Sequence, residues 1–238
     1  MNIEVCFSPS LINLFDTKDK IIVVIDVLRA TSSICVAFQN GAGSIIPLVT
    51  IEESFSYKSK GYLIAGERNG EMIVGFDFGN SPFSFMSENI KDKRIAFTTT
   101  NGTQAIQSVK NASQIVIGSF LNLDVLCNWL SKQNSNILCL CAGWKSKFNL
   151  EDTLCSGAIV NNLRQTANCV IDCDSALASE HLYLLAKDNL FQFLEDSSHR
   201  KRLKKLNIEK DIEYCLTPNQ CNVIPIMKDG VLIKLNEN

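Results

Sequence analysis

The sequence predicts an α/β fold, a three-layer α/β/α arrangement around a mixed, mostly parallel sheet. Short apolar runs rich in β-branched residues alternate with helical patterns along most of the chain. These runs are almost continuously apolar, which is typical of strands covered by helices on both faces of a sheet. The chain has 238 residues and no linker rich in Pro, Gly or Ser. We therefore expect residues 1–238 to form a single domain.

The strand-to-helix units follow one another in a regular order. The run "IIVVIDV" (21–27) leads through a polar turn into the helical pattern "ICVAFQNGA" (34–42), where Gly41 predicts the helix end. The run "YLIA" (62–65) predicts a strand before a long loop. The remaining units pair a strand with a helix: 94–100 with 104–112, 114–119 with 123–133, and 136–142 with 151–165.

The last third of the chain has a different pattern. Two helical stretches are expected between about residues 174 and 206. They precede "NVIPIMKDGVLIKL" (222–235), which predicts two strands joined by a turn at Asp229-Gly230. We expect this hairpin to form an antiparallel edge, which makes the sheet mixed.

Composition excludes several classes of function. The net charge of −2 gives no basic field, so no nucleic-acid partner is expected. The basic segment "HRKRLKK" (199–205) is interpreted as a solvated helix face. No apolar run approaches the roughly 20 residues of a membrane span, and the first residues do not resemble a signal peptide. We therefore expect a cytoplasmic protein with no membrane partner.

The cysteines do not indicate a disulfide scaffold or a zinc site. Five of the ten lie within apolar segments, and the chain has no CxxC pair. We expect these five to be reduced thiols of the core: Cys35, Cys139, Cys141, Cys155 and Cys169. The two histidines, His181 and His199, lack the spacing of zinc ligands.

Polar residues cluster where the predicted strands end, which is where α/β sheets place their sites. In "DVLRATSS" (26–33), Asp26 and Arg29 follow a buried strand, and Thr31 and Ser32 begin the next helix. A buried acid needs a cation or metal partner. Arg29 could be that partner in a purely structural ion pair, or both residues could belong to a reaction site.

A second cluster, "TTTNGT" (98–103), opens the helix after another strand. The residues concerned are Thr99, Thr100, Asn101, Gly102 and Thr103. Neutral donors and free N–H groups at a helix start suit an anion, although a hydroxyl-rich N-cap is an alternative interpretation. The segment lacks the lysine and the spacing of a P-loop.

Two further segments carry acids. The loop 65–85 contains Glu67, Arg68, Asp77 and Asn80 among glycines, and is either functional or a packed surface loop. The segment "NLEDT" (149–153) starts a helix with two adjacent acids, Glu151 and Asp152, which would also suit simple helix capping.

Together these clusters favour phosphoryl transfer. Carboxylates suit Mg²⁺, which takes one or two of them and shares its other positions with a substrate phosphate. Arginines and helix N-termini suit anionic oxygens. The acids and cations placed at strand ends or helix starts are Asp26, Glu67, Asp77, Glu151 and Asp152, with Arg29, Arg68 and Lys145.

The ordered set of motifs resembles the ComB family of 2-phosphosulfolactate phosphatases. The resemblance covers nearly the whole chain. It rests on "IDVLRATSSI" (25–34), "AGERNG" (65–70), "GFDFGNSP" (75–82), "TTTNGTQAI" (98–106), "EDTLCSGAIV" (151–160) and "DIEYCLTPNQCNVIPIM" (211–227).

The resemblance implies Mg²⁺-dependent hydrolysis of 2-phospho-3-sulfolactate to 3-sulfolactate and phosphate. In methanogens this step belongs to coenzyme M biosynthesis. It also implies a ComB-like fold, a small anionic phosphate ester as the binding partner, and a homodimer.

On this basis each candidate residue receives an expected role. Asp26, Glu67, Glu151 and Asp152 would bind Mg²⁺ and orient the attacking water. Arg29 and Arg68 would bind anionic groups and the charge that develops during transfer. The remaining donors to the substrate would be Thr31, Ser32, Asn80, Thr99, Thr100, Asn101, Gly102 and Thr103.

Three alternatives stay open. Asp26 could be a nucleophile, although the segment lacks the DxD pattern of haloacid-type phosphatases, which favours water. The same chemistry could act on another 2-phosphorylated hydroxy acid. The chain could also be a non-catalytic anion-binding protein with this fold. A nucleotide-binding protein is disfavoured, because neither GxGxxG nor a P-loop occurs.

Overall fold

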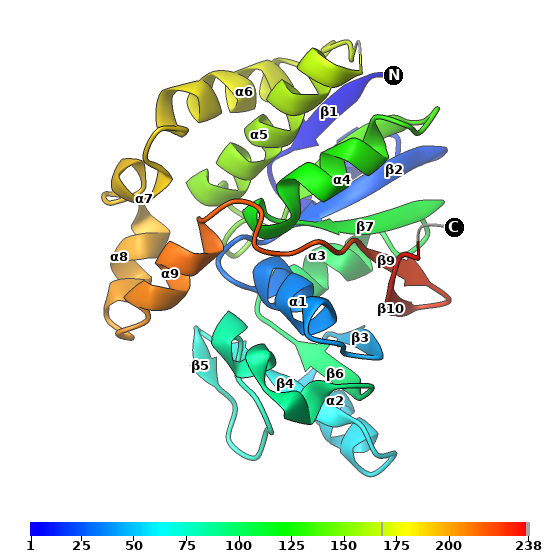
Figure 1. Cartoon of the computed structure of the whole chain (residues 1–238), viewed down its shortest axis with the longest axis vertical. Coiled ribbons are helices and arrows are strands. Elements are labelled where there is room, and N and C mark those ends of the chain that lie inside the picture. The colour runs from blue at the N-terminus through cyan, green and yellow to red at the C-terminus, as the bar shows by residue number, and fades with distance from the viewer. Residues whose placement is uncertain (168, 237–238) are drawn as a thin grey trace.

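The computed structural model describes residues 1–167 and 169–236, which form one ten-stranded sheet with helices packed against it (Figure 1). The strand order is β1-β8-β2-β7-β9-β10-β3-β6-β4-β5, and most neighbouring strands are parallel. The α/β class and the mixed sheet are therefore confirmed. The strands are β1 Ile3–Cys6, β2 Lys20–Ile25, β3 Ser44–Leu48, β4 Leu63–Arg68, β5 Glu71–Met72, β6 Arg94–Thr98, β7 Gln114–Gly118, β8 Asn136–Cys141, β9 Pro225–Lys228 and β10 Val231–Lys234.

Four helices follow strands as the alternating pattern predicts, whereas the helix that follows β3 was not predicted. Four short 3₁₀ turns connect other segments. The helices are α1 Ala30–Gln39, α2 Ile51–Lys58, α3 Gly102–Ser108, α4 Leu123–Leu130, α5 Leu150–Thr166, α6 Asp174–Ala186, α7 Leu190–Phe193, α8 Ser198–Lys204 and α9 Glu209–Cys215. The 3₁₀ turns are η1 Pro9–Leu14, η2 Pro82–Met86, η3 Glu88–Ile90 and η4 Phe120–Asn122. No helix in the described part of the chain is long and apolar enough to cross a membrane.

Strand β2 shows how the sheet forms two cores. Its side chains point alternately to opposite faces, because a strand has a period of two. Ile21 and Val23 join the cluster that contains α4 and α5, whereas Ile22 and Val24 join the cluster that contains α1 and α3. A strand buried on both faces must be apolar throughout, which explains the run "IIVVI".

The C-terminal hairpin lies inside the sheet, so the expectation of an antiparallel edge was wrong. β9 pairs with β7 through Val116 and Ile226, and β10 pairs with β3 through Ile45 and Leu232. The hairpin thereby joins two groups of parallel strands that would otherwise each expose an unpaired edge. The sequence reveals its turn, but not which strands flank it.

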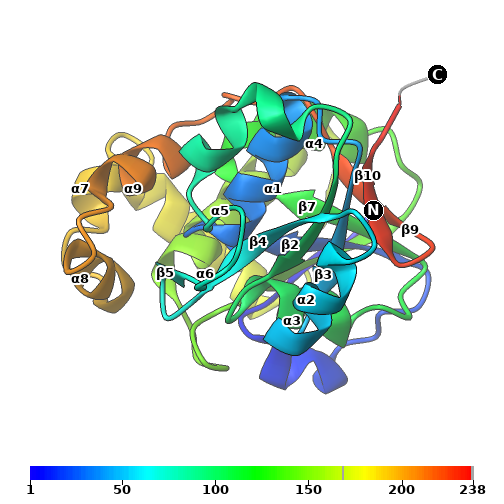
Figure 2. The ribbon, with the colours of Figure 1, turned by 90° about the horizontal axis from the view of Figure 1, so that it is seen from below.

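The segment after α5 forms more helices than expected. Two N-caps divide it: the Asn189 side chain accepts from Gln192 N at 2.9 Å, and that of Ser197 accepts from Arg200 N at 3.2 Å. These caps begin α7 and α8 as separate short helices. Figures 1 and 2 show that α7, α8 and α9 lie together at one side of the molecule, beyond the sheet.

The cysteines behave as predicted. All ten are free thiols, and all but Cys173 are buried. Burial raises the pKa of Cys35, Cys141 and Cys155 well above the usual value. These thiols therefore act as small apolar groups of the core.

Candidate functional site

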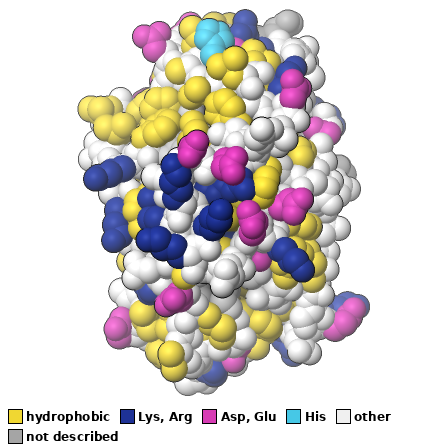
Figure 3. Space-filling model, turned by 90° about the vertical axis from the view of Figure 1, so that its left-hand side faces the viewer, with side chains coloured by type: hydrophobic (Ala, Val, Ile, Leu, Met, Phe, Trp, Pro, Cys, Tyr) yellow, Lys and Arg dark blue, Asp and Glu magenta, His cyan; other side chains and the backbone are white. Residues whose placement is uncertain are grey.

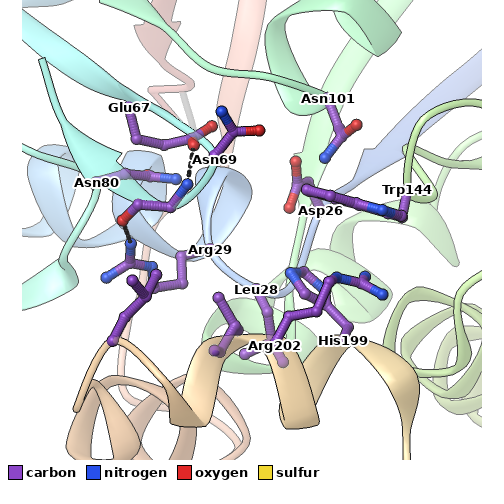
Figure 4. A pocket seen from close by; sticks show the side chains of 13 residues that line it. Asp26, Leu28, Arg29, Glu67, Asn69, Asn80, Asn101, Trp144, His199 and Arg202 are labelled. Atoms are coloured by element: carbon purple, nitrogen blue, oxygen red, sulfur yellow. Dashed lines mark hydrogen bonds between the residues drawn. The ribbon is translucent and has the colours of Figure 1, made fainter.

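A cavity of about 230 Å³ lies between the strand ends and α8 (Figure 4). It is bounded on one side by the turn after β2, the β4–β5 turn and the start of α3, and on the other by α8. Its lining residues are Asp26, Leu28, Arg29, Glu67, Asn69, Gly70, Asn80, Asn101, Trp144, His199, Arg202, Leu203 and Leu206. Three of the segments singled out in the sequence therefore converge here.

Asp26 is the first residue after β2 and is 6% exposed. The turn that carries it is held by hydroxyl groups: Thr31 Oγ1 accepts from Asp26 N at 3.0 Å, and Ser32 Oγ donates to Val27 O at 2.8 Å. Thr31 and Ser32 are thus bound within the protein and position the acid. Burial raises the pKa of Asp26, and the negative charges of Asp152, Glu67 and Glu151 raise it further.

Gly102 allows α3 to approach Asp26 closely. A Cβ at this position would lie 2.7 Å from Asp26 Oδ2 and 2.5 Å from the Ala30 side chain. No larger residue fits without moving the acid or the start of α1. The glycine of "TTTNGT" is therefore required by packing against the site.

Glu67 is fixed by three donors. Its Oε1 accepts from Thr100 N at 2.7 Å, and its Oε2 accepts from Gly70 N at 2.6 Å and Thr100 Oγ1 at 3.2 Å. Thr99 and Thr103 bond to each other, each backbone N–H donating to the other's Oγ1 at 3.1 Å. The threonines thus hold the turn, while Glu67 and Asn101 face the cavity.

Arg29 does not pair with Asp26, which excludes the structural ion pair considered from the sequence. Its guanidinium forms a buried ion pair with Asp211 of α9 and donates to Gly70 O at 2.9 Å. Among the described residues no Lys, Arg or His side chain lies within ion-pair distance of the Asp26 carboxylate. Asp26 is therefore a buried acid without a cation.

Arg68 and Asp77 lie outside the cavity lining. The Arg68 guanidinium donates to Thr98 Oγ1 and Val49 O, both at 2.9 Å. Asp77 pairs with Lys58 at 3.1 Å and accepts from Ile64 N at 2.8 Å. Both side chains join neighbouring elements, so the structure does not bring Arg68 to the anion site expected for it, and Asp77 does not join the other acids at the cavity.

Glu151 and Asp152 are fully buried and absent from the cavity lining. Asp152 Oδ1 accepts from Val27 N at 2.8 Å, and its Oδ2 accepts from Gly143 N at 3.1 Å. Burial and the neighbouring Glu151 raise the pKa of Asp152 to about 7. Asp152 thus supports the turn that carries Asp26.

Glu151 contacts the cavity through a histidine. Its Oε1 bonds to His199 Nδ1, and its Oε2 is buried without a partner among the described residues. The His199 ring lies against Trp144, with ring centroids 5.6 Å apart. This pair connects the start of α5 to α8.

The residues present fit a sparse magnesium site. No three His, Cys, Asp or Glu side chains in residues 1–167 and 169–236 converge as a metal-binding group. Mg²⁺ commonly uses only one or two carboxylates and completes its shell with water and substrate phosphate. Asp26 and Glu67 line the cavity and match that requirement, whereas the expected four-carboxylate set does not form there.

The basic segment 199–205 is not merely a solvated face, so that interpretation was wrong. His199, Arg202, Leu203 and Leu206 all line the cavity. Their spacing of i, i+3, i+4 and i+7 is that of one helical face, and this spacing is visible in the sequence. Lys201, Lys204 and Lys205 are exposed. Sequence reasoning also assigned no role to Asn69, Trp144 and Asp211, although Asn69 lies in the motif "AGERNG" and Asp211 begins the motif at 211–227.

Comparison with known proteins gives a consistent result. A family model described as 2-phosphosulpholactate phosphatase matches residues 6–230. A probable 2-phosphosulfolactate phosphatase of Caldanaerobacter subterraneus subsp. tengcongensis is 39% identical over 225 residues, covering 93% of each chain. One of Thermotoga petrophila is 43% identical over 211 residues, covering 89% of this chain and 90% of its own. One of Clostridium botulinum is 33% identical, covering 99% of this chain and all of its own.

Proposed function

The chain belongs to the 2-phosphosulfolactate phosphatase family, and from this membership we propose that its cavity hydrolyses 2-phospho-3-sulfolactate to 3-sulfolactate and inorganic phosphate with Mg²⁺. The observation that carries this proposal is that the buried Asp26 has no positively charged partner in the described part of the chain. A buried carboxylate at the end of a central strand has no cation partner among the described residues. Such a group is costly unless a ligand compensates it.

The charges of the cavity support the proposal of a divalent cation. Asp26 and Glu67 line the same cavity, and two carboxylates would repel a phosphate dianion. The chemistry that Mg²⁺ would supply here is neutralisation of the phosphate charge and activation of a water molecule. We propose Asp26 and Glu67 as its protein ligands.

Asp152 and Glu151 are proposed to position other residues of the site through hydrogen bonds. Asp152 accepts from Val27 N and Gly143 N, so it fixes the turn after β2 at the angle that presents Asp26. Glu151 holds His199. These two residues are proposed as supports, and this replaces their expected role as metal ligands.

Two amides are suited to hold the substrate. Asn80 and Asn101 line the cavity, and each can donate to a phosphate oxygen. Asn80 Oδ1 is buried without a partner among the described residues, which suits a donor such as water and leaves the amide nitrogen for a phosphate oxygen. Asn101 Oδ1 accepts from Lys145 N at 3.1 Å, so its amide nitrogen is directed elsewhere.

Asp26 holds the cation or attacks phosphorus directly, and both routes require its carboxylate. Replacing Asp26 by Asn should lower the rate of phosphate release from 2-phosphosulfolactate by about 10³-fold or more. Asp77→Asn is the matched control, because Asp77 lies outside the cavity. Its kcat should stay within about threefold of the unmodified protein.

Thermal unfolding of the metal-free protein checks that Asp26→Asn leaves the fold intact. Asp26→Asn removes a buried negative charge beside three other acids, so the metal-free variant should unfold at the same or a higher temperature. Retention of activity within about threefold in Asp26→Asn would exclude Asp26 from the reaction.

A further inference from the structure

Arg202 is the cavity residue whose environment the proposed function leaves unexplained. It extends from α8 toward Trp144 (Figure 4), and its guanidinium carbon lies 4.3 Å from the centroid of the Trp144 ring. Its Nε is buried without a partner among the described residues. Its Nη1 donates only weakly, to Ser198 Oγ at 3.3 Å. An arginine held over an aromatic ring presents its donors in a restricted direction.

The other cations near the cavity are already occupied or lie outside it. Arg29 is neutralised by Asp211, and Arg200 stacks on Phe191 and contacts Glu209. Lys145 is exposed and absent from the cavity lining. Arg202, by contrast, has no carboxylate within ion-pair distance in the described part of the chain. It is therefore available to an anionic ligand.

The two acids of the cavity and Arg202 lie on opposite sides of it. Asp26 and Glu67 lie at the strand ends, whereas Arg202 lies on the α8 side, with Leu203 and Leu206 next to it. A ligand that carries a phosphate at one end and an acid group at the other would match this arrangement. The phosphate would lie toward the carboxylates and their cation, and the second acid group would lie toward the guanidinium.

We propose that Arg202 binds the carboxylate or sulfonate that the substrate carries beside its phosphate, and that it thereby makes the cavity selective for phosphate esters of hydroxy acids. This inference rests on the proposed function. The planar guanidinium can form two parallel hydrogen bonds to either acid group. Figure 3 shows further Lys and Arg side chains gathered on this face.

The kinetic test compares two phosphate esters of secondary alcohols. Besides its phosphate, 2-phosphosulfolactate carries a carboxylate and a sulfonate, whereas isopropyl phosphate carries no further acid group. Arg202→Gln should raise KM for 2-phosphosulfolactate by about 10- to 100-fold, the usual loss for a hydrogen bond to a charged group. Its kcat/KM for isopropyl phosphate should stay within about threefold. Arg202→Lys keeps the positive charge and loses the paired N–H donors of the guanidinium, so its KM for 2-phosphosulfolactate should lie between those of the unmodified protein and Arg202→Gln.

The control is Lys204→Gln, which removes the same charge from the same helix at an exposed position. It should leave both substrates unaffected. If Arg202→Gln loses activity equally on both esters, or on neither, the assignment of Arg202 is wrong.

A binding measurement separates this inference from the proposed function. Calorimetry in EDTA measures binding of 3-sulfolactate, lactate and 2-hydroxyethanesulfonate, which carry both acid groups, the carboxylate alone and the sulfonate alone. Arg202→Gln should weaken the binding of 3-sulfolactate. It should also weaken the binding of the single-acid compound whose acid group Arg202 contacts. If it weakens them while the unmodified protein releases no phosphate, the proposed hydrolysis fails and the role of Arg202 stands. Equal binding by Arg202→Gln and the unmodified protein would overturn the role of Arg202.

Discussion

Asp26 derives its character from the residues that surround it. It follows a strand that is buried on both faces, its turn is fixed by Thr31 and Ser32, and its neighbour Arg29 is held by Asp211. Burial raises the pKa of this carboxyl above its usual value, and the negative charges of Asp152 and Glu67 raise it further. A divalent cation held at this position would compensate the negative charge of the carboxylate.

Gly102 provides a test of the close approach to Asp26. Gly102→Ala should lower kcat by about 10-fold or more and stability by about 1–3 kcal/mol, because the new Cβ would overlap Asp26 Oδ2 and the Ala30 side chain. Phosphate release and denaturant unfolding measure the two effects. Gln104→Ala is the control, since Gln104 is exposed on the same helix and should change neither quantity. A fully active Gly102→Ala would contradict this packing.

At the scale of elements, one ion pair fastens α9 to the site. Asp211 contacts the Arg29 guanidinium and accepts from Ser81 Oγ at 3.1 Å. It thereby joins α9 to the turn after β2 and to the loop before η2. The outer wall of the cavity is built from short helices, which depend on such tertiary contacts because short helices are marginal alone.

Asp211→Ala should therefore lower the free energy of unfolding by about 3–5 kcal/mol, because it leaves Arg29 buried without its partner. Denaturant unfolding of the full chain measures this change. Glu213→Ala removes an exposed acid of the same helix and should cost less than about 0.5 kcal/mol. Equal effects of the two substitutions would show that the Arg29–Asp211 pair does not stabilise the fold.

The elements also show why part of the site could be predicted from sequence and part could not. Asp26 and Asn101 follow strands and Glu67 lies near the end of β4, and parallel strands place such residues at a common edge. Arg68 follows Glu67 in β4 and Asp77 lies in the loop after β5, but their hydrogen bonds turn both side chains toward neighbouring elements. Chain position alone does not reveal which way a loop side chain points.

The wall formed by α8 was hidden for a different reason. Its basic residues suggested a solvated face, yet the apolar Leu203 and Leu206 fall at helical spacing with His199 and Arg202. The spacing indicates a face that packs against something. Only the tertiary structure shows that this face closes a cavity.

At the scale of the whole molecule, local patterns identified the α/β fold and the alternating strands. The strand order depends on long-range pairing, so the central place of β9 and β10 could not be read from the turn at Asp229-Gly230. The same order brings the turn after β2 and the β4–β5 turn, which belong to different halves of the sheet, to one cavity. The site is therefore a product of the complete sheet.

The most direct test of the central claim is phosphate release from 2-phosphosulfolactate by the full chain, measured in excess EDTA and again after excess Mg²⁺ is restored. Because the cation is proposed to compensate the carboxylates beside the phosphate, its removal should lower the rate by about 100-fold or more, and its return should restore it. Equal rates with EDTA and with Mg²⁺ would contradict the account.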